Sequence, residues 1–141
     1  MKLIVNNKKA YFNYTVVDEY EVGIVLFGTE IKSIRKGKVS ITEAYCSVIN
    51  NELKILNMTI KQYEYGNIFN HEEGRIKKLL AHKSEIRKLS NSIKGGLTII
   101  PLKLYIKEGK AKILIGTCKG KKNYDKREVI KERDLKRVKV D

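Results

Sequence analysis

The sequence predicts a mainly β fold with helices: a small antiparallel β-barrel that carries a flexible basic tail. Three observations predict this fold class. Several short segments alternate β-branched or aromatic residues with polar ones, one longer segment has the three-four spacing of an amphipathic helix, and the composition changes near Lys119. With 141 residues, 42% of them hydrophobic, the chain is long enough for one domain with a core.

The first elements are a basic arm, a strand and a short helix. Residues 1–9 are short, polar and basic, and we expect them to form a loose arm. Residues 10–26 alternate imperfectly and are rich in aromatic and β-branched side chains, which favours a strand. Thr29 can cap a short helix that begins at Glu30, and Gly37 is suited to end that helix.

The middle of the chain predicts a hairpin and a long helix. Residues 41–58 form two predicted strands around Asn50-Asn51, because asparagine tolerates the left-handed conformation that a tight hairpin turn needs. Residues 73–93 have apolar side chains at three-four spacing, so this segment is the one strong helix that the sequence predicts.

The last elements are a second hairpin and the tail. Residues 97–106 and 111–117 alternate as strands on either side of a turn. The OB-fold has this element order, with four or five antiparallel strands and a helix before the last hairpin. We therefore expect an OB-fold-like antiparallel β-barrel over residues 10–118, with the long helix before its last hairpin, followed by a tail over residues 119–141.

The charge of the chain limits the possible partners. The net charge is +14, from 30 Lys and Arg against 16 Asp and Glu. Such an excess attracts polyanions, so nucleic acid is the leading partner and an anionic membrane surface the second. No apolar run approaches the length of about 18 residues that a membrane-spanning helix needs. Cys46 and Cys118 have no CxxC companion, which indicates two reduced thiols in a cytoplasmic protein.

No motif in the sequence predicts an enzyme. The glycines of Gly116 to Lys121 are too close together for a phosphate-binding loop, and no Ser or Thr follows to hold magnesium. His71 and His82 are the only histidines; no further ligand pair accompanies them, and we interpret them as surface or helix-capping residues. We expect no catalytic activity, no cofactor and no metal.

Several features favour RNA. Tyr124 lies among cations and outside any apolar pattern, so we expect its ring to stack on a base. Glu30 could accept from a base donor, but a charge that stabilises a helix N-terminus explains it more simply. Asp125 and Glu128 have the spacing of a capping box, while the apolar side of the tail is thin. We expect the tail to be disordered when free and helical when bound to RNA.

Long segments of the chain match a known family. The chain resembles the small protein B family of bacteria, also called SsrA-binding proteins or SmpB, although its tail is shorter than is usual there. The resemblance covers nearly the whole chain, and the two most specific segments are Gly28 to Arg35 and Gly120 to Arg127. Further matches are Asn7-Lys8-Lys9-Ala10, Gly23-Ile24-Val25-Leu26, Asn70-His71, Arg75, Lys78-Leu79-Leu80, Glu85-Ile86, Leu89, Ile100-Pro101-Leu102 and Leu104-Tyr105.

The resemblance implies an OB-fold adaptor of trans-translation that has no enzymatic activity. Such a protein binds the tRNA-like domain of transfer-messenger RNA and delivers this RNA to stalled ribosomes, where its tail senses the empty mRNA channel. We expect a cytoplasmic monomer without a membrane partner. The implied RNA-binding residues are Asn7, Lys8, Glu30, Lys32, Arg35, Lys119, Lys121 and Lys122. The implied tail residues at the ribosome are Tyr124, Asp125, Lys126, Arg127, Lys131 and Arg133.

Two other functions stay open from the residues alone. A ribosomal protein or general single-stranded RNA-binding OB-fold protein would have the same charge and fold, but it would need neither Glu30 nor the trio Asp125-Lys126-Arg127. An enzyme that hydrolyses or modifies RNA would need a clustered acid, base or metal site.

Overall fold

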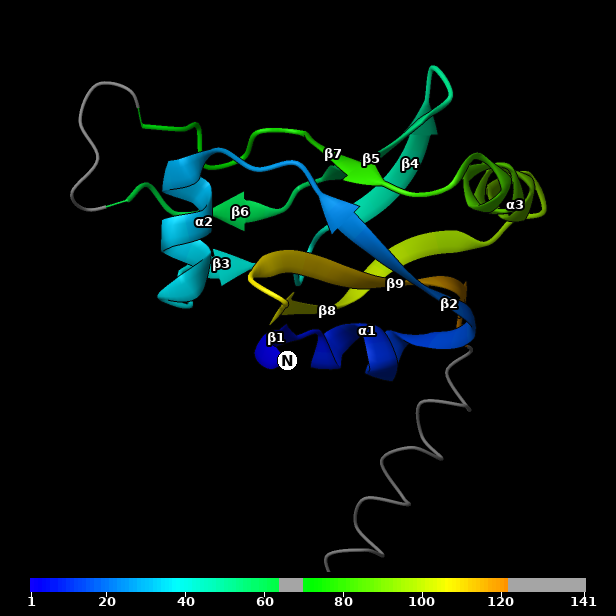
Figure 1. Ribbon diagram of the computed structural model, residues 1–141. Coiled ribbons are helices and arrows are strands. Elements are labelled where there is room, and N and C mark those ends of the chain that lie inside the picture. The colour runs from blue at the N-terminus through cyan, green and yellow to red at the C-terminus, as the bar shows by residue number, and fades with distance from the viewer. Residues whose placement is uncertain (64–69, 122–141) are drawn as a thin grey trace, which may run out of the picture.

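The computed structural model describes residues 1–63 and 70–121 (Figure 1). Nine strands and three helices lie within these residues. In chain order they are β1 (Lys2–Asn6), α1 (Lys8–Asn13), β2 (Tyr14–Ile24), α2 (Gly28–Arg35), β3 (Val39–Ser40), β4 (Tyr45–Ile49), β5 (Glu52–Leu56), β6 (Thr59–Ile60), β7 (Lys77–Leu80), α3 (Lys83–Lys94), β8 (Thr98–Lys107) and β9 (Lys110–Gly120).

The strands close into a ring that is compatible with the expected OB-like plan. The order in the main sheet is β1-β8-β4-β5-β7-β2-β9, and β8 also pairs with β9, which closes the ring. All strand pairings among the described residues are antiparallel, and β3 and β6 form a small separate sheet beside α2. Fully buried apolar side chains from several strands fill the interior, among them Leu53, Ile55, Leu104 and Ile113.

The first residues are ordered into a strand, so the expected loose arm is wrong. β1 pairs with the C-terminal part of β8, with Leu3 opposite Tyr105. β4 pairs with β8 near its beginning, at Ile99, so the rest of that edge of β8 is available to β1. The apolar residues Ile4 and Val5 then pack against the core.

The start of the expected strand over residues 10–26 is instead a helix. Asn7 caps α1, because its side-chain oxygen accepts a hydrogen bond from the Ala10 N–H at 3.2 Å. Ala10 is buried and packs with Leu102 and Cys118 in a second, smaller apolar cluster. The strand β2 therefore begins only at Tyr14, where its pairing with β9 begins.

The long helix expected over residues 73–93 is also wrong in its first half. Lys77 and Leu79 are buried, whereas Ile76, Lys78 and Leu80 are exposed. This alternation has the period of two that a strand has, and β7 pairs there with β5 and β2. The helix itself, α3, begins only at Lys83 and follows the N-cap residue His82.

The turns and the short helix agree well with the sequence. The β4–β5 hairpin turns at Asn50 and Asn51, whose φ angles are 51° and 62°. Gly37 has a φ of 75°, and its N–H donates to the Ile34 carbonyl at 2.9 Å, which ends α2 as expected. The helix begins at Gly28 rather than at Glu30, and β9 continues to Gly120, two residues beyond the expected end of the barrel.

Gly116 of β9 gives a test of the packing in the smaller apolar cluster beside α1. A Cβ at this position would lie 2.8 Å from Leu102 Cδ1 and 3.1 Å from Val16 Cγ1. We expect Gly116→Ala to lower the free energy of unfolding by about 1–3 kcal/mol, measured by urea denaturation, because the buried side chains must shift. Gly120→Ala in the same strand is the control, since nothing lies within 4 Å of its Cβ position. Equal stability of the two variants would contradict the described packing.

Candidate nucleic-acid interface

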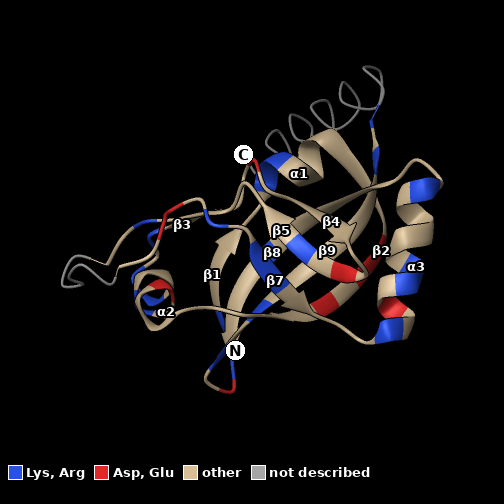
Figure 2. Ribbon diagram, turned by 90° about the horizontal axis from the view of Figure 1, so that it is seen from above, with Lys and Arg blue, Asp and Glu red and all other residues tan. Residues whose placement is uncertain are grey.

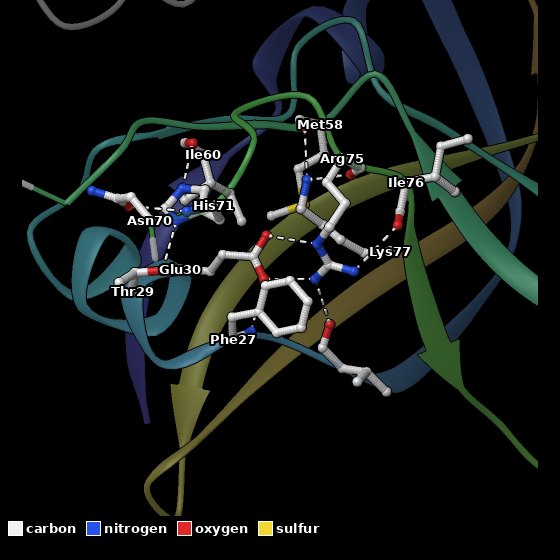
Figure 3. Close-up of polar contacts among 11 residues, drawn as sticks. Phe27, Thr29, Glu30, Met58, Ile60, Asn70, His71, Arg75, Ile76 and Lys77 are labelled. Carbon is white, nitrogen blue, oxygen red and sulfur yellow. Dashed lines mark hydrogen bonds and ion pairs between the residues drawn. The ribbon is translucent and has the colours of Figure 1, made fainter. Parts of the chain in front are cut away.

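A buried ion pair lies beneath α2. Glu30 has no exposed surface, and Arg75 donates to both oxygens of its carboxylate (Figure 3). The distances are 2.6 Å from Nη2 to Oε1 and 3.2 Å from Nε to Oε2. The Phe27 N–H donates to Oε1 as well, at 2.7 Å. The expectation that Glu30 faces an RNA partner is therefore not met, because its carboxylate is used inside the protein.

Arg75 joins three segments that are distant in sequence. Its guanidinium donates to the carbonyl of Val25 at 3.3 Å and to that of Ile76 at 3.4 Å. The same group lies 4.1 Å from the centroid of the Phe27 ring. The end of β2, the start of α2 and the approach to β7 are thus held by one side chain.

Lys77 is a second cation within this network, and it is completely buried. Its Nζ donates to the carbonyls of Met58 at 3.0 Å and Arg75 at 2.6 Å. Burial lowers the pKa of Lys77 to about 8; the nearby Glu30 charge acts against this shift and the Arg75 charge adds to it. Arg75 therefore forms the ion pair with Glu30, while the nearby Lys77 ammonium is held by carbonyl oxygens.

His71 fastens the other side of α2. Its Nε2 lies 2.9 Å from the Ile60 carbonyl, and its Nδ1 lies 2.8 Å from the Thr29 hydroxyl. A carbonyl can only accept, so we infer that Nε2 carries the proton and that Thr29 donates to Nδ1. The interpretation of His71 as a surface or capping residue is wrong: it is buried and satisfied on both nitrogens. His82, at the N-cap of α3, does cap a helix.

The outward face of α2 carries two of the cations that the sequence predicts to bind RNA. Lys32 and Arg35 are exposed and lie three residues apart, so they share one side of the helix (Figure 2). The ammonium groups of Lys32 and Lys36 lie 5.4 Å and 5.2 Å from the centroid of the Tyr63 ring. The Tyr63 ring thus lies close to two cations of α2. Such an arrangement suits contacts with both the phosphates and the bases of a nucleic acid.

Asn7 and Lys8, the two RNA-binding residues predicted within the first nine positions, differ in their exposure. Asn7 is buried, and its side-chain amide donates to the carbonyls of Pro101 at 2.9 Å and Ile41 at 3.3 Å. It caps α1 and joins β8 to the segment that follows β3, so it does not face a partner as expected. Lys8 is exposed at the first position of α1.

Lys119 and Lys121, which the sequence also predicts to bind RNA, lie near the start of β2, at the opposite end from α2. Lys119 is exposed near the end of β9. Lys121 is half-buried; its Nζ donates to the Tyr11 carbonyl at 3.0 Å and its N–H to the Asn13 carbonyl at 2.9 Å. The structure thus separates these two from Lys32 and Arg35 instead of forming one patch. Outside the described residues lie Lys122, Tyr124, Asp125, Lys126, Arg127, Lys131 and Arg133.

Sequence reasoning missed the part that Phe27, Arg75 and Lys77 take in this site. Arg75 was noted as one of many cations and as a position that matches the family, but 45 positions separate it from Glu30. The one local signal was an aromatic residue, Phe27, three positions before the start of the predicted helix at Glu30.

In the described part of the chain, no group of three His, Cys, Asp or Glu side chains could hold a metal ion. Residues 1–63 and 70–121 also contain no helix that is long and apolar enough to cross a membrane. Cys46 and Cys118 are buried and free, and burial raises the pKa of both thiols.

Known proteins resemble this chain over nearly its whole length. SsrA-binding proteins from Treponema denticola and Enterococcus faecalis are 48% and 51% identical to it, over 97% and 99% of this chain and 90% and 88% of the relatives. The SsrA-binding protein of Flavobacterium johnsoniae is 54% identical over 93% of this chain and 88% of its own length.

A solved structure agrees with these relatives. It is described as "tmRNA-SmpB: a journey to the center of the bacterial ribosome", and its matching chain is 40% identical with a TM-score of 0.71. The match covers 89% of this chain and 93% of that one. The family model described as SmpB protein matches residues 4–140. With a matching fold, matching relatives and a family model that spans almost every residue, the chain belongs to the SmpB family.

Proposed function

We propose that this protein is an RNA-binding adaptor of trans-translation. It binds the tRNA-like domain of transfer-messenger RNA and brings this RNA to stalled ribosomes. The observation that carries the proposal is the near full-length match to SsrA-binding proteins and to a solved SmpB chain described with tmRNA and the bacterial ribosome. The protein works as a monomer at the ribosome, and hence in the cytoplasm, and it supplies binding rather than catalysis.

The α2 face is the proposed contact with transfer-messenger RNA. Lys32 and Arg35 are exposed, form no ion pair with the described residues, and project from a helix fixed by a buried network. Because the helix backbone is already fixed, these cations can neutralise phosphates without the additional cost of ordering a flexible segment. Lys8 adds a further exposed charge, whereas Glu30 and Asn7 act as positioning residues from inside the protein.

The residues at the far end of β2 form the proposed second contact. Lys119 and Lys121, continued by Lys122, would meet RNA where the chain leaves the barrel. Beyond them, the proposed tail contacts are Tyr124, Asp125, Lys126 and Arg127 in the decoding region, with Lys131 and Arg133 further along the mRNA channel. We propose that the tail becomes helical only when it is bound there.

A competition experiment tests the proposed function against a general single-stranded RNA-binding protein. Labelled transfer-messenger RNA is bound at moderate salt and challenged with the same RNA or with unstructured RNA of equal length. An adaptor should be displaced at least about tenfold more readily by transfer-messenger RNA, because contacts beyond phosphate neutralisation give the preference. Equal competition by the two RNAs would contradict the adaptor function.

The α2 cations should set part of the salt dependence of binding. We expect Lys32→Ala with Arg35→Ala to reduce the slope of log K against log salt by about 1.5 to 2, because two phosphate contacts are lost. Affinity measured by filter binding across a salt series gives this slope. Lys88→Ala with Lys94→Ala removes the same charge from the exposed side of α3 and should leave the slope nearly unchanged. The same decrease in both double variants would show that α2 is not a specific contact.

Glu30 should affect RNA binding through the position of α2. We expect Glu30→Ala to lower the free energy of unfolding by about 2–4 kcal/mol, because Arg75 loses its buried partner. RNA affinity should fall while the salt slope keeps its value, since no phosphate contact is removed. Thermal denaturation and filter binding measure the two effects. Weaker binding with unchanged stability would instead indicate that Glu30 contacts the RNA directly.

A further inference from the structure

An exposed apolar strip lies beside α2. It consists of Val25, Phe27, Ile76 and Leu80, which are 42%, 54%, 51% and 54% exposed. Large apolar side chains that gather on a surface commonly mark an interaction site, whereas the same residues scattered singly would not. Of these four side chains, that of Phe27 alone contacts the ionic network, because its ring packs against Arg75.

Strand pairing makes the strip continuous. Ile76 and Leu80 lie on the outward side of the β7 segment, and Gly23 of β2 stands opposite Leu80. The Val25 N–H donates to the Lys78 carbonyl at 2.9 Å, so Val25 lies beside the same outward surface. A Cβ on Gly23 would lie 3.4 Å from Leu80 Cβ, which shows that Leu80 covers the bare backbone of its neighbour.

Arg75 connects Phe27 to this surface. Its guanidinium bonds the carbonyls of Val25 and Ile76 and covers part of the Phe27 ring at 4.1 Å from the centroid. Glu30 holds the guanidinium in place from below. Phe27 therefore has a fixed cation on its ring and still keeps more than half of its surface exposed (Figure 3).

The charges around the strip select the kind of partner. Lys112 Nζ lies 3.7 Å from the Cβ position of Gly23, at the Leu80 end, and Lys78 lies between Ile76 and Leu80. Glu52 is near Lys78, at 3.8 Å, but it is shared with Lys54 at 3.9 Å. The surroundings are thus net positive, which suits a partner that has both apolar flat faces and negative charge. An unpaired stretch of RNA has both, in its bases and its phosphates.

We propose that an unpaired base of the bound RNA stacks on Phe27 and that the adjoining nucleotide lies along Val25 and Ile76. The proposal rests on the proposed RNA-binding function and adds a non-ionic contact to it. Base stacking on an aromatic side chain tolerates any base, and a guanidinium on the same ring adds a cation–π contact. The strip would then contribute to affinity at salt concentrations that weaken the phosphate contacts of α2.

A tryptophan at position 27 gives a direct test, because the chain contains no tryptophan. The Phe27→Trp variant is titrated with a transfer-messenger RNA transcript, and binding is followed in parallel by gel shift. We expect the fluorescence of the new tryptophan to be quenched along the binding curve. Ile49→Trp, at the end of β4, is the matched control and should bind equally without quenching.

Affinity measurements give the second readout. Phe27→Ala should weaken binding by about 5- to 100-fold with an unchanged salt slope, and Phe27→Tyr should restore binding to within about twofold of the original chain. The backbone N–H that bonds Glu30 is present in every variant, so the support of α2 is retained. The proposal is overturned if Phe27→Ala binds RNA with wild-type affinity, or if the tryptophan at position 27 is not quenched at saturating RNA. Either result would indicate that the strip binds a protein partner instead.

The same titration with unstructured RNA separates this proposal from the proposed function. If the unmodified chain shows no preference for transfer-messenger RNA, the adaptor function fails. Quenching of the tryptophan at position 27 by the unstructured RNA then still supports base stacking at the strip, and its absence overturns it.

Discussion

The ion pair between Glu30 and Arg75 is the interaction on which the proposed RNA-binding part of the molecule depends. α2 has eight residues, too few to be stable as an isolated helix in water. Its hold on the barrel comes from buried Ile34, from the Thr29–His71 contact and above all from the clamp of Arg75 on Glu30. Loss of either partner of a buried ion pair leaves an uncompensated charge, so the orientation of the helix is tied to this pair.

The charges of the same network sum to a net positive charge beneath α2. Glu30 is close to two cations, Arg75 and Lys77, and the lowered pKa of Lys77 is the cost of placing the second one in the interior. An apolar residue at position 77 would avoid this cost but could not satisfy the two carbonyls that Lys77 bonds. The arrangement favours a negatively charged partner outside, in addition to the exposed side chains of Lys32 and Arg35.

Local signals predicted the elements that local chemistry determines. The asparagine pair of the β4–β5 hairpin, the end of α2 at Gly37 and the last two strands follow from residues close together in sequence. The first half of the predicted long helix was wrong because the three-four spacing of Ile76, Leu79 and Leu80 fits a helix. Pairing with β2 and β5 instead makes a strand there, which buries Leu79 and leaves Ile76 and Leu80 exposed.

The same limit applies to the candidate site. Lys32 and Arg35 were predicted as exposed cations on a short helix, and they are. The burial of Glu30 could not be predicted, since its partner Arg75 is brought to it only by the closed barrel, and the buried role of Asn7 likewise depends on Pro101. Finally, β2 has eleven residues, about 33 Å of extended chain, and joins the two groups of proposed RNA-contacting cations. This strand fixes the spacing at which one rigid molecule can touch the two proposed RNA surfaces. Because β2 pairs with both β7 and β9, that spacing cannot change without a change in the register of the sheet.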